Sequence, residues 1–173
     1  HDALLDSAAR LRVLASVHEL LYANANSNQN VSLPPLLQSL GSALVQSFGR
    51  THPHVTLEIQ CDQMELPAQD AVALALLANE AITNEYKHAF VDESAGMITV
   101  ALHCSHENAL SLRVEDTGSG FASTNDGAGM GLTLIRTFAT QLRGALVVRP
   151  TDPGSGTLIT LTIPTPGKPR APE

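Results

Sequence analysis

The sequence predicts an α+β fold: a two-layer sandwich in which helices cover one face of a mixed sheet, preceded by a helical segment. The strand-like segments come in adjacent pairs, which favours a largely antiparallel sheet over a doubly wound parallel one. A long helical pattern without proline or glycine follows the first strand, over residues 69–89. Two further helical patterns come before that strand.

The first 48 residues form the predicted helical segment. Apolar residues recur every three or four positions over residues 3–23, as in an amphipathic helix. A polar break follows at 24–30, and Ser32 and Pro34 then suit the cap and first turn of a second helix that ends near residue 48. The apolar stripes of both helices are too wide for one domain to cover. We therefore expect a two-fold helical bundle, and a homodimer, through these helices.

The remaining elements belong to a predicted domain over residues 49–164, followed by a proline-rich flexible tail at 165–173. Alternation of apolar and polar residues predicts the strands, and a spacing of three and four predicts the helices. The expected elements in order are strand 55–60, helix 69–89, strands 97–103 and 110–116, a glycine-rich loop 118–131, helix 132–142, and strands 145–149 and 157–164.

Composition excludes several classes of protein. The 173 residues carry 17 acidic and 10 basic side chains, a net charge of −7, which argues against binding nucleic acid through a basic surface. A phosphate ligand stays compatible with this charge, because backbone N–H groups at a helix start bind phosphate. No apolar run is long enough to span a membrane. The two cysteines lack metal-ligand spacing and are expected to be reduced.

Helix 69–89 carries a polar cluster on one face. Its members are spaced by four, three and one and share an arc of roughly 100°: Glu80, Asn84, Lys87 and His88. The amide oxygen of Asn84 suits Mg²⁺, and the Glu80 carboxylate suits the orientation or deprotonation of a hydroxyl nucleophile. A solvated face with a Glu–Lys pair is the alternative.

Strand 110–116 ends in a carboxylate that points toward the core. Asp116 shares a face with Leu110, Leu112 and Val114 by the period of two. A buried carboxylate needs a hydrogen-bond donor, and the amino group of a purine base is one candidate. A cap for the following turn is the other. Thr157 takes the corresponding inner position on its own strand, which is a weak signal alone.

The loop between strand 110–116 and helix 132–142 contains five glycines: Gly118, Gly120, Gly127, Gly129 and Gly131. Glycine lets a ligand approach the backbone closely. Gly131 opens into a helix, whose free N–H groups would face what the loop encloses. The spacing matches neither the GxxxxGK[ST] phosphate loop nor the GxGxxG dinucleotide motif.

Four segments in this order resemble the conserved boxes of the GHKL (Bergerat-fold) ATPases, which include sensor histidine kinases, gyrase-type ATPases and anti-sigma serine kinases. They are NEAITNEYKHA at 79–89, DTGSGF at 116–121, GAGMGL at 127–132 and GT at 156–157. Residues 8–45 resemble the second helix of the dimerisation and phosphoacceptor domain in one class of bacterial two-component histidine kinases.

The resemblance implies a role for each residue of the first box. Asn84 would ligate Mg²⁺, and Glu80 would be the polar or general-base residue one turn before it. Lys87 would touch phosphate, and His88 would lie near the ribose or phosphate. Glu85 stands where such kinases carry a small residue, but it falls off the site face, so we expect no loss of binding.

The other boxes would bind the rest of the nucleotide. Asp116 would accept from the adenine amino group, with Thr157 supporting it through a hydroxyl or water. Two glycines would shape that pocket, Gly118 and Gly120. Gly129 and Gly131 would close the phosphate end, Gly127 and Leu132 would also bind the nucleotide, and residues 121–128 would be a short ATP lid.

By this resemblance the chain is the ATP-binding catalytic portion of a cytoplasmic sensor histidine kinase. It would use ATP and Mg²⁺ to phosphorylate a histidine and would pass the phosphoryl group to the receiver domain of a response regulator. Neither His1 nor His18 fits the acceptor motif, so the acceptor is expected upstream. An anti-sigma serine kinase that binds a sigma factor is the alternative, and a degenerate scaffold without ATP binding is a third.

Overall fold

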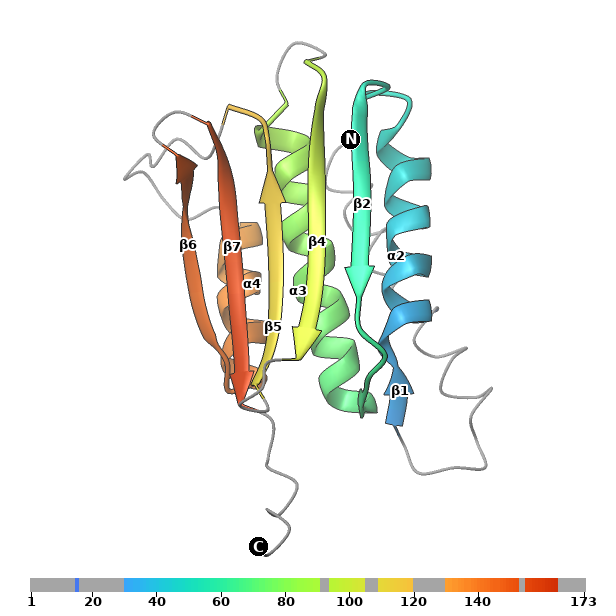
Figure 1. The fold of residues 1–173 in the computed structure, drawn as a ribbon, viewed down its shortest axis with the longest axis vertical. Coiled ribbons are helices and arrows are strands. Elements are labelled where there is room, and N and C mark those ends of the chain that lie inside the picture. Colours follow the sequence, from blue (N-terminus) through green and yellow to red (C-terminus); the bar gives the residue numbers. More distant parts are fainter. Residues whose placement is uncertain are drawn as a thin grey trace, which may run out of the picture.

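The computed structural model describes residues 15, 30–90, 94–104, 109–119, 130–152 and 155–164. Five strands form one sheet in the order β2-β4-β5-β7-β6, with α3 and α4 behind it and α2 beside β2 (Figure 1). The predicted α+β class with a mixed sheet is therefore confirmed. The predicted helix 3–23, the lid 121–128 and the tail 165–173 lie outside the described residues, apart from Ala15.

The elements agree with the predicted ones to within a few residues. The β2 strand runs parallel to β4, and the other neighbours in the sheet are antiparallel. The bounds are β1 Asn30–Ser32, α2 Leu33–Phe48, β2 Val55–Cys61, β3 Glu65–Pro67, α3 Ala68–His88, β4 Gly96–Cys104, β5 Ala109–Asp116, α4 Met130–Gln141, β6 Ala145–Asp152 and β7 Ser155–Pro164.

One face of the sheet is buried under the helices. The buried positions alternate along β5, so that Leu110, Leu112, Val114 and Asp116 point inward together. The small residues of α3, such as Ala75 and Ala78, let this helix pack closely in the same core. The predicted inward orientation of Asp116 follows from this alternation.

The α2 helix shares that core. Its buried leucines are Leu33, Leu36, Leu37, Leu40 and Leu44. A Cβ added at Gly41 would lie 2.3 Å from Cδ1 of Ile59, so the helix backbone closely approaches the side chains of β2. Phe48 stacks on Tyr86 of α3 with ring centroids 4.9 Å apart. The division of the chain at residues 48 and 164 remains a prediction.

A short ribbon of β1 and β3 was not predicted. These antiparallel strands have three residues each, too few for an alternating pattern to be recognised. The ribbon also changes the start of α2. Ser32 occupies the N-cap position but makes no side-chain capping hydrogen bond, and the Leu33 N–H donates to the Met64 carbonyl at 3.0 Å. The expected Ser32 cap is absent because the N2 and N3 residues are Pro34 and Pro35, which have no N–H to donate.

Candidate functional site

The second half of α3 buries polar side chains that an ordinary core helix would not carry. Asn79, Glu80, Thr83 and Glu85 are all at most 5% exposed. The Asn79 amide donates to the Glu80 carboxylate at 3.4 Å. Four buried atoms have no hydrogen-bond partner within the described part of the chain: Asn79 Oδ1, Thr83 Oγ1 and both carboxyl oxygens of Glu85. Buried polar groups are normally satisfied, so this helix segment indicates a functional site.

The start of α4 lies against Asn84. A Cβ added at Gly131 would be 2.6 Å from Oδ1 of Asn84 and 2.9 Å from its Nδ2. The first turn of a helix has unpaired N–H groups and the positive end of the dipole. The structure thus brings Asn84 and Gly131, from two separate sequence boxes, to one place. Lys87 and Leu132 are half-buried, and His88 is exposed in the last turn of α3.

Asp116 lies at the end of β5 and is 1% exposed. One carboxyl oxygen accepts the Gly118 N–H at 2.6 Å, and the other accepts the Thr157 N–H at 2.5 Å. Such bonds to backbone N–H groups stabilise a buried carboxylate and fix its orientation. Thr157 therefore holds Asp116 through its backbone, a contact that side-chain periodicity could not predict.

Glycines allow the chain to close around Asp116. Gly156 has a φ of +64°, and a Cβ there would lie 2.0 Å from the Asp116 carbonyl oxygen. A Cβ at Gly118 would lie 2.2 Å from the carbonyl oxygen of Ala89. The end of β5 is thus packed against both β7 and the end of α3.

Glu85 has surroundings that the sequence analysis did not anticipate. It was expected to fall off the site face, but it is 1% exposed and interacts with Asp116. Burial, and then the Asp116 carboxylate, raise the pKa of Glu85 from 4.5 to about 9. A helical wheel alone does not show that Glu85 is buried, because it does not include β5, which also packs against α3. The sequence did contain a signal for this burial, because the Glu85 carboxylate lies on the same helix face as core residues.

The protein groups at this site suit a metal ion that phosphate oxygens also ligate. Within the described ranges, no three His, Cys, Asp or Glu side chains gather into a metal site. Mg²⁺ bound with a nucleotide needs only one or two protein oxygens, because phosphates and water supply the others. The Asn84 amide beside the Gly131 backbone fits that requirement. The predicted residues Gly120, Gly127 and Gly129 lie outside the described residues.

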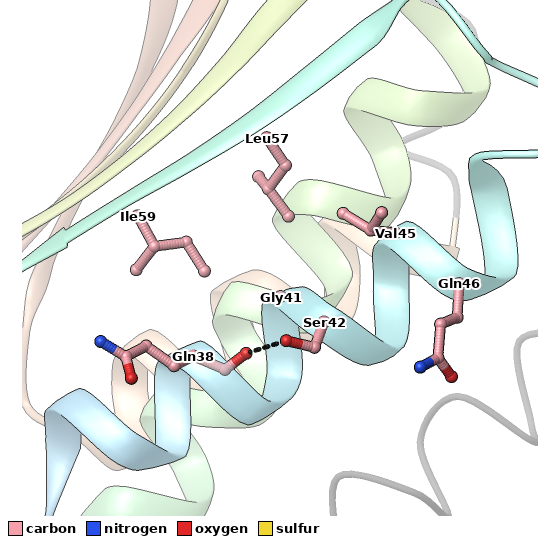
Figure 2. A pocket seen from close by; sticks show the side chains of 7 residues that line it. All are labelled: Gln38, Gly41, Ser42, Val45, Gln46, Leu57 and Ile59. Atoms are coloured by element: carbon pink, nitrogen blue, oxygen red, sulfur yellow. Dashed lines mark hydrogen bonds between the residues drawn. The ribbon is translucent and has the colours of Figure 1, made fainter.

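A groove between α2 and β2 is chemically different (Figure 2). It has a volume of about 580 Å³ and is lined by Gln38, Gly41, Ser42, Val45, Gln46, Leu57 and Ile59. None of these lining side chains is ionisable, so they offer no charge for phosphate or a metal ion. We therefore place the candidate nucleotide site at α3, α4 and the end of β5.

We expect Gly131→Ala to weaken Mg-nucleotide binding by about tenfold or more. The new methyl group would displace the Asn84 amide, which lies 2.6 Å from its position, while alanine itself suits a helix. Calorimetric titration with ATP and Mg²⁺ measures the effect, and thermal unfolding tests the fold. Thr133→Ala, an exposed change on the same helix, is the control. If Gly131→Ala bound the nucleotide with unchanged affinity, Asn84 would have no part in nucleotide binding.

The sequence model of the family described as histidine kinase-, DNA gyrase B- and HSP90-like ATPase matches residues 69–167. Blue-light-activated histidine kinase 2 of Erythrobacter litoralis is 26% identical over 167 residues, which are 94% of this chain and 47% of that protein. This chain thus spans about half the length of that relative. Serine-protein kinase RsbW of Listeria innocua is 48% identical over 48 residues, 28% of this chain and 30% of that protein.

A solved structure shows the same fold. The histidine kinase domain from the Erythrobacter litoralis EL346 blue-light activated histidine kinase superposes with a TM-score of 0.83 at 24% identity. The match covers 92% of this chain and 79% of that one. Among the described helices of this chain, none has the length and apolar character to cross a membrane.

Proposed function

Because the chain belongs to the family of histidine kinase-, DNA gyrase B- and HSP90-like ATPases, we propose that it is the ATP-binding catalytic portion of a sensor histidine kinase. In this proposal it transfers the γ-phosphoryl group of ATP to a histidine, for relay to the receiver domain of a response regulator. The parent protein acts in the cytoplasm as a homodimer joined through the N-terminal helices.

The observation that carries the proposal is the contact between Asn84 of α3 and Gly131 of α4. It puts a metal-ligating amide next to the N-terminal turn of a helix, where phosphate binds. Glu80, buried one turn earlier, is positioned to orient or accept a proton from the attacking group. Bound Mg²⁺ would neutralise charge on the phosphates. Lys87 and His88 would contact the phosphate and ribose.

The base would lie at Asp116. Its carboxylate is fixed by two backbone N–H groups and retains lone pairs to accept from the adenine amino group. Because Gly118 and Gly156 have no side chain, the backbone packs closely around this carboxylate. In this arrangement the base is bound at the end of β5 and the phosphates at the start of α4.

A second candidate is a serine kinase that regulates a sigma factor. The 48% identity with RsbW over 48 residues favours it. The histidine kinase relative instead matches 94% of the chain, including the residues ahead of α3. The first proposal therefore accounts for more of the sequence.

Phosphorylation of the full-length protein with γ-labelled ATP and Mg²⁺ tests the proposal. We expect an acid-labile, base-stable label that disappears when the upstream acceptor histidine is replaced and when Asn84→Asp is introduced. Thr133→Ala should label like the unchanged protein. Label on a serine of a partner protein would support the second candidate. Binding of ATP without any labelling would contradict both.

A further inference from the structure

Glu85, in the last turn of α3, is a buried carboxyl group to which the proposed reaction assigns no role. Its side chain is 1% exposed, and neither carboxyl oxygen accepts a hydrogen bond from a donor among the residues that the structure describes. An ionised carboxyl group in this position is costly, since burial removes its hydration. Its retention therefore calls for an explanation beyond packing.

Backbone hydrogen bonds join the end of α3, which carries Glu85, to the loop that follows Asp116. The Ala89 N–H donates to the Glu85 carbonyl at 2.9 Å, and the Ser119 N–H donates to the Ala89 carbonyl at 2.9 Å. Gly118 packs on the same carbonyl, with no room there for a Cβ. The last turn of α3 and the loop after Asp116 are thus packed against each other.

The two carboxyl groups have unequal surroundings. Asp116 accepts two backbone N–H groups, which fix the orientation of its carboxyl group. Glu85 accepts none in the described structure. Two adjacent buried carboxyl groups do not both stay ionised, so the proton resides on Glu85, in agreement with its raised pKa. Asp116 is the one charged neighbour that acts on Glu85 within the described residues.

We infer that Glu85 is a positioning residue of the base pocket: its neutral carboxyl group donates an O–H bond to Asp116 and fixes the oxygen that accepts the adenine amino group. This inference rests on the proposed ATP site. It adds a third donor to the Gly118 and Thr157 N–H groups that hold Asp116. Glu85 itself touches no reacting atom in this role.

The test compares ATP with purine riboside 5′-triphosphate, which lacks the amino group that Asp116 would accept. Affinities of both nucleotides are measured by calorimetry with Mg²⁺ at one pH. We expect the unchanged protein to prefer ATP by at least about tenfold. Glu85→Gln keeps this ratio, because its amide N–H still donates to Asp116. Glu85→Met fills similar space without a donor and reduces the ratio to about threefold or less, with the affinity for the analogue nearly unchanged.

Controls separate this role from packing. Glu85→Ala is the second variant without a donor, in case Glu85→Met does not fold, and Glu58→Gln is an exposed control on β2. A packing defect would weaken both nucleotides equally. The inference would be overturned if Glu85→Met or Glu85→Ala kept the full preference for ATP over the analogue. It would also be overturned if Glu85→Gln lost this preference. An unchanged protein that binds neither nucleotide would overturn the proposed ATP site, and the inference with it.

Discussion

Asp116→Asn is expected to raise the dissociation constant for ATP by at least about a hundredfold and to lower the free energy of unfolding by about 2 kcal/mol. Both oxygens of the carboxylate accept backbone N–H groups, from Gly118 and Thr157. An amide has one oxygen and one NH₂ group, so one of these N–H groups would face another donor. The adenine amino group would lose its charged acceptor. Calorimetry with ATP measures the affinity, and denaturant unfolding measures the stability.

Glu115→Gln is the matched control for this change. Glu115 precedes Asp116 on β5, points to the other face and pairs with the exposed Arg113 at 3.5 Å. Such surface pairs contribute little to stability. If Asp116→Asn bound ATP with the same affinity as this control, Asp116 would not be part of the nucleotide site.

Glu85→Gln should have the opposite effect on stability, raising the free energy of unfolding by about 3 kcal/mol at pH 7. The pKa of Glu85 is raised from 4.5 to about 9, so between these values the folded protein holds a proton that the unfolded chain releases. Folding must take up this proton, and the stability of the unchanged protein falls as pH rises through that range. Glutamine has nearly the same shape and is neutral at every pH.

Denaturant unfolding of both proteins from pH 4 to pH 9 checks this expectation. The stability difference should be small below pH 4.5 and should grow toward pH 9. Glu58→Gln, an exposed change on β2, should follow the unchanged protein throughout. A stability difference that does not depend on pH would show that Glu85 is ionised in the folded protein.

Periodicity was sufficient for most of the fold. The alternation along 110–116 and 157–164 predicted both strands and their inward faces, because a period of two leaves one choice of buried face. The β1–β3 ribbon was missed, since three-residue strands show no period. Ser32 makes no side-chain capping bond, because Pro34 and Pro35 at N2 and N3 have no N–H to donate.

The candidate site was predicted in parts. Helical spacing grouped Glu80 with Asn84, and strand alternation pointed Asp116 inward. The contact of Asn84 with Gly131 joins residues 47 positions apart, which local spacing does not connect. The placement of Gly120, Gly127 and Gly129 stays a prediction.

By itself, the sequence determined the fold class, the family resemblance and the residue types of a nucleotide site, because these depend on periodicity and on motif order. Only the tertiary structure decided the setting of Asp116 and Glu85. The pKa of a buried carboxyl group depends on every element packed around it, here β5 and α3. A helical wheel describes one helix alone, and so it did not show that Glu85 is buried beside Asp116.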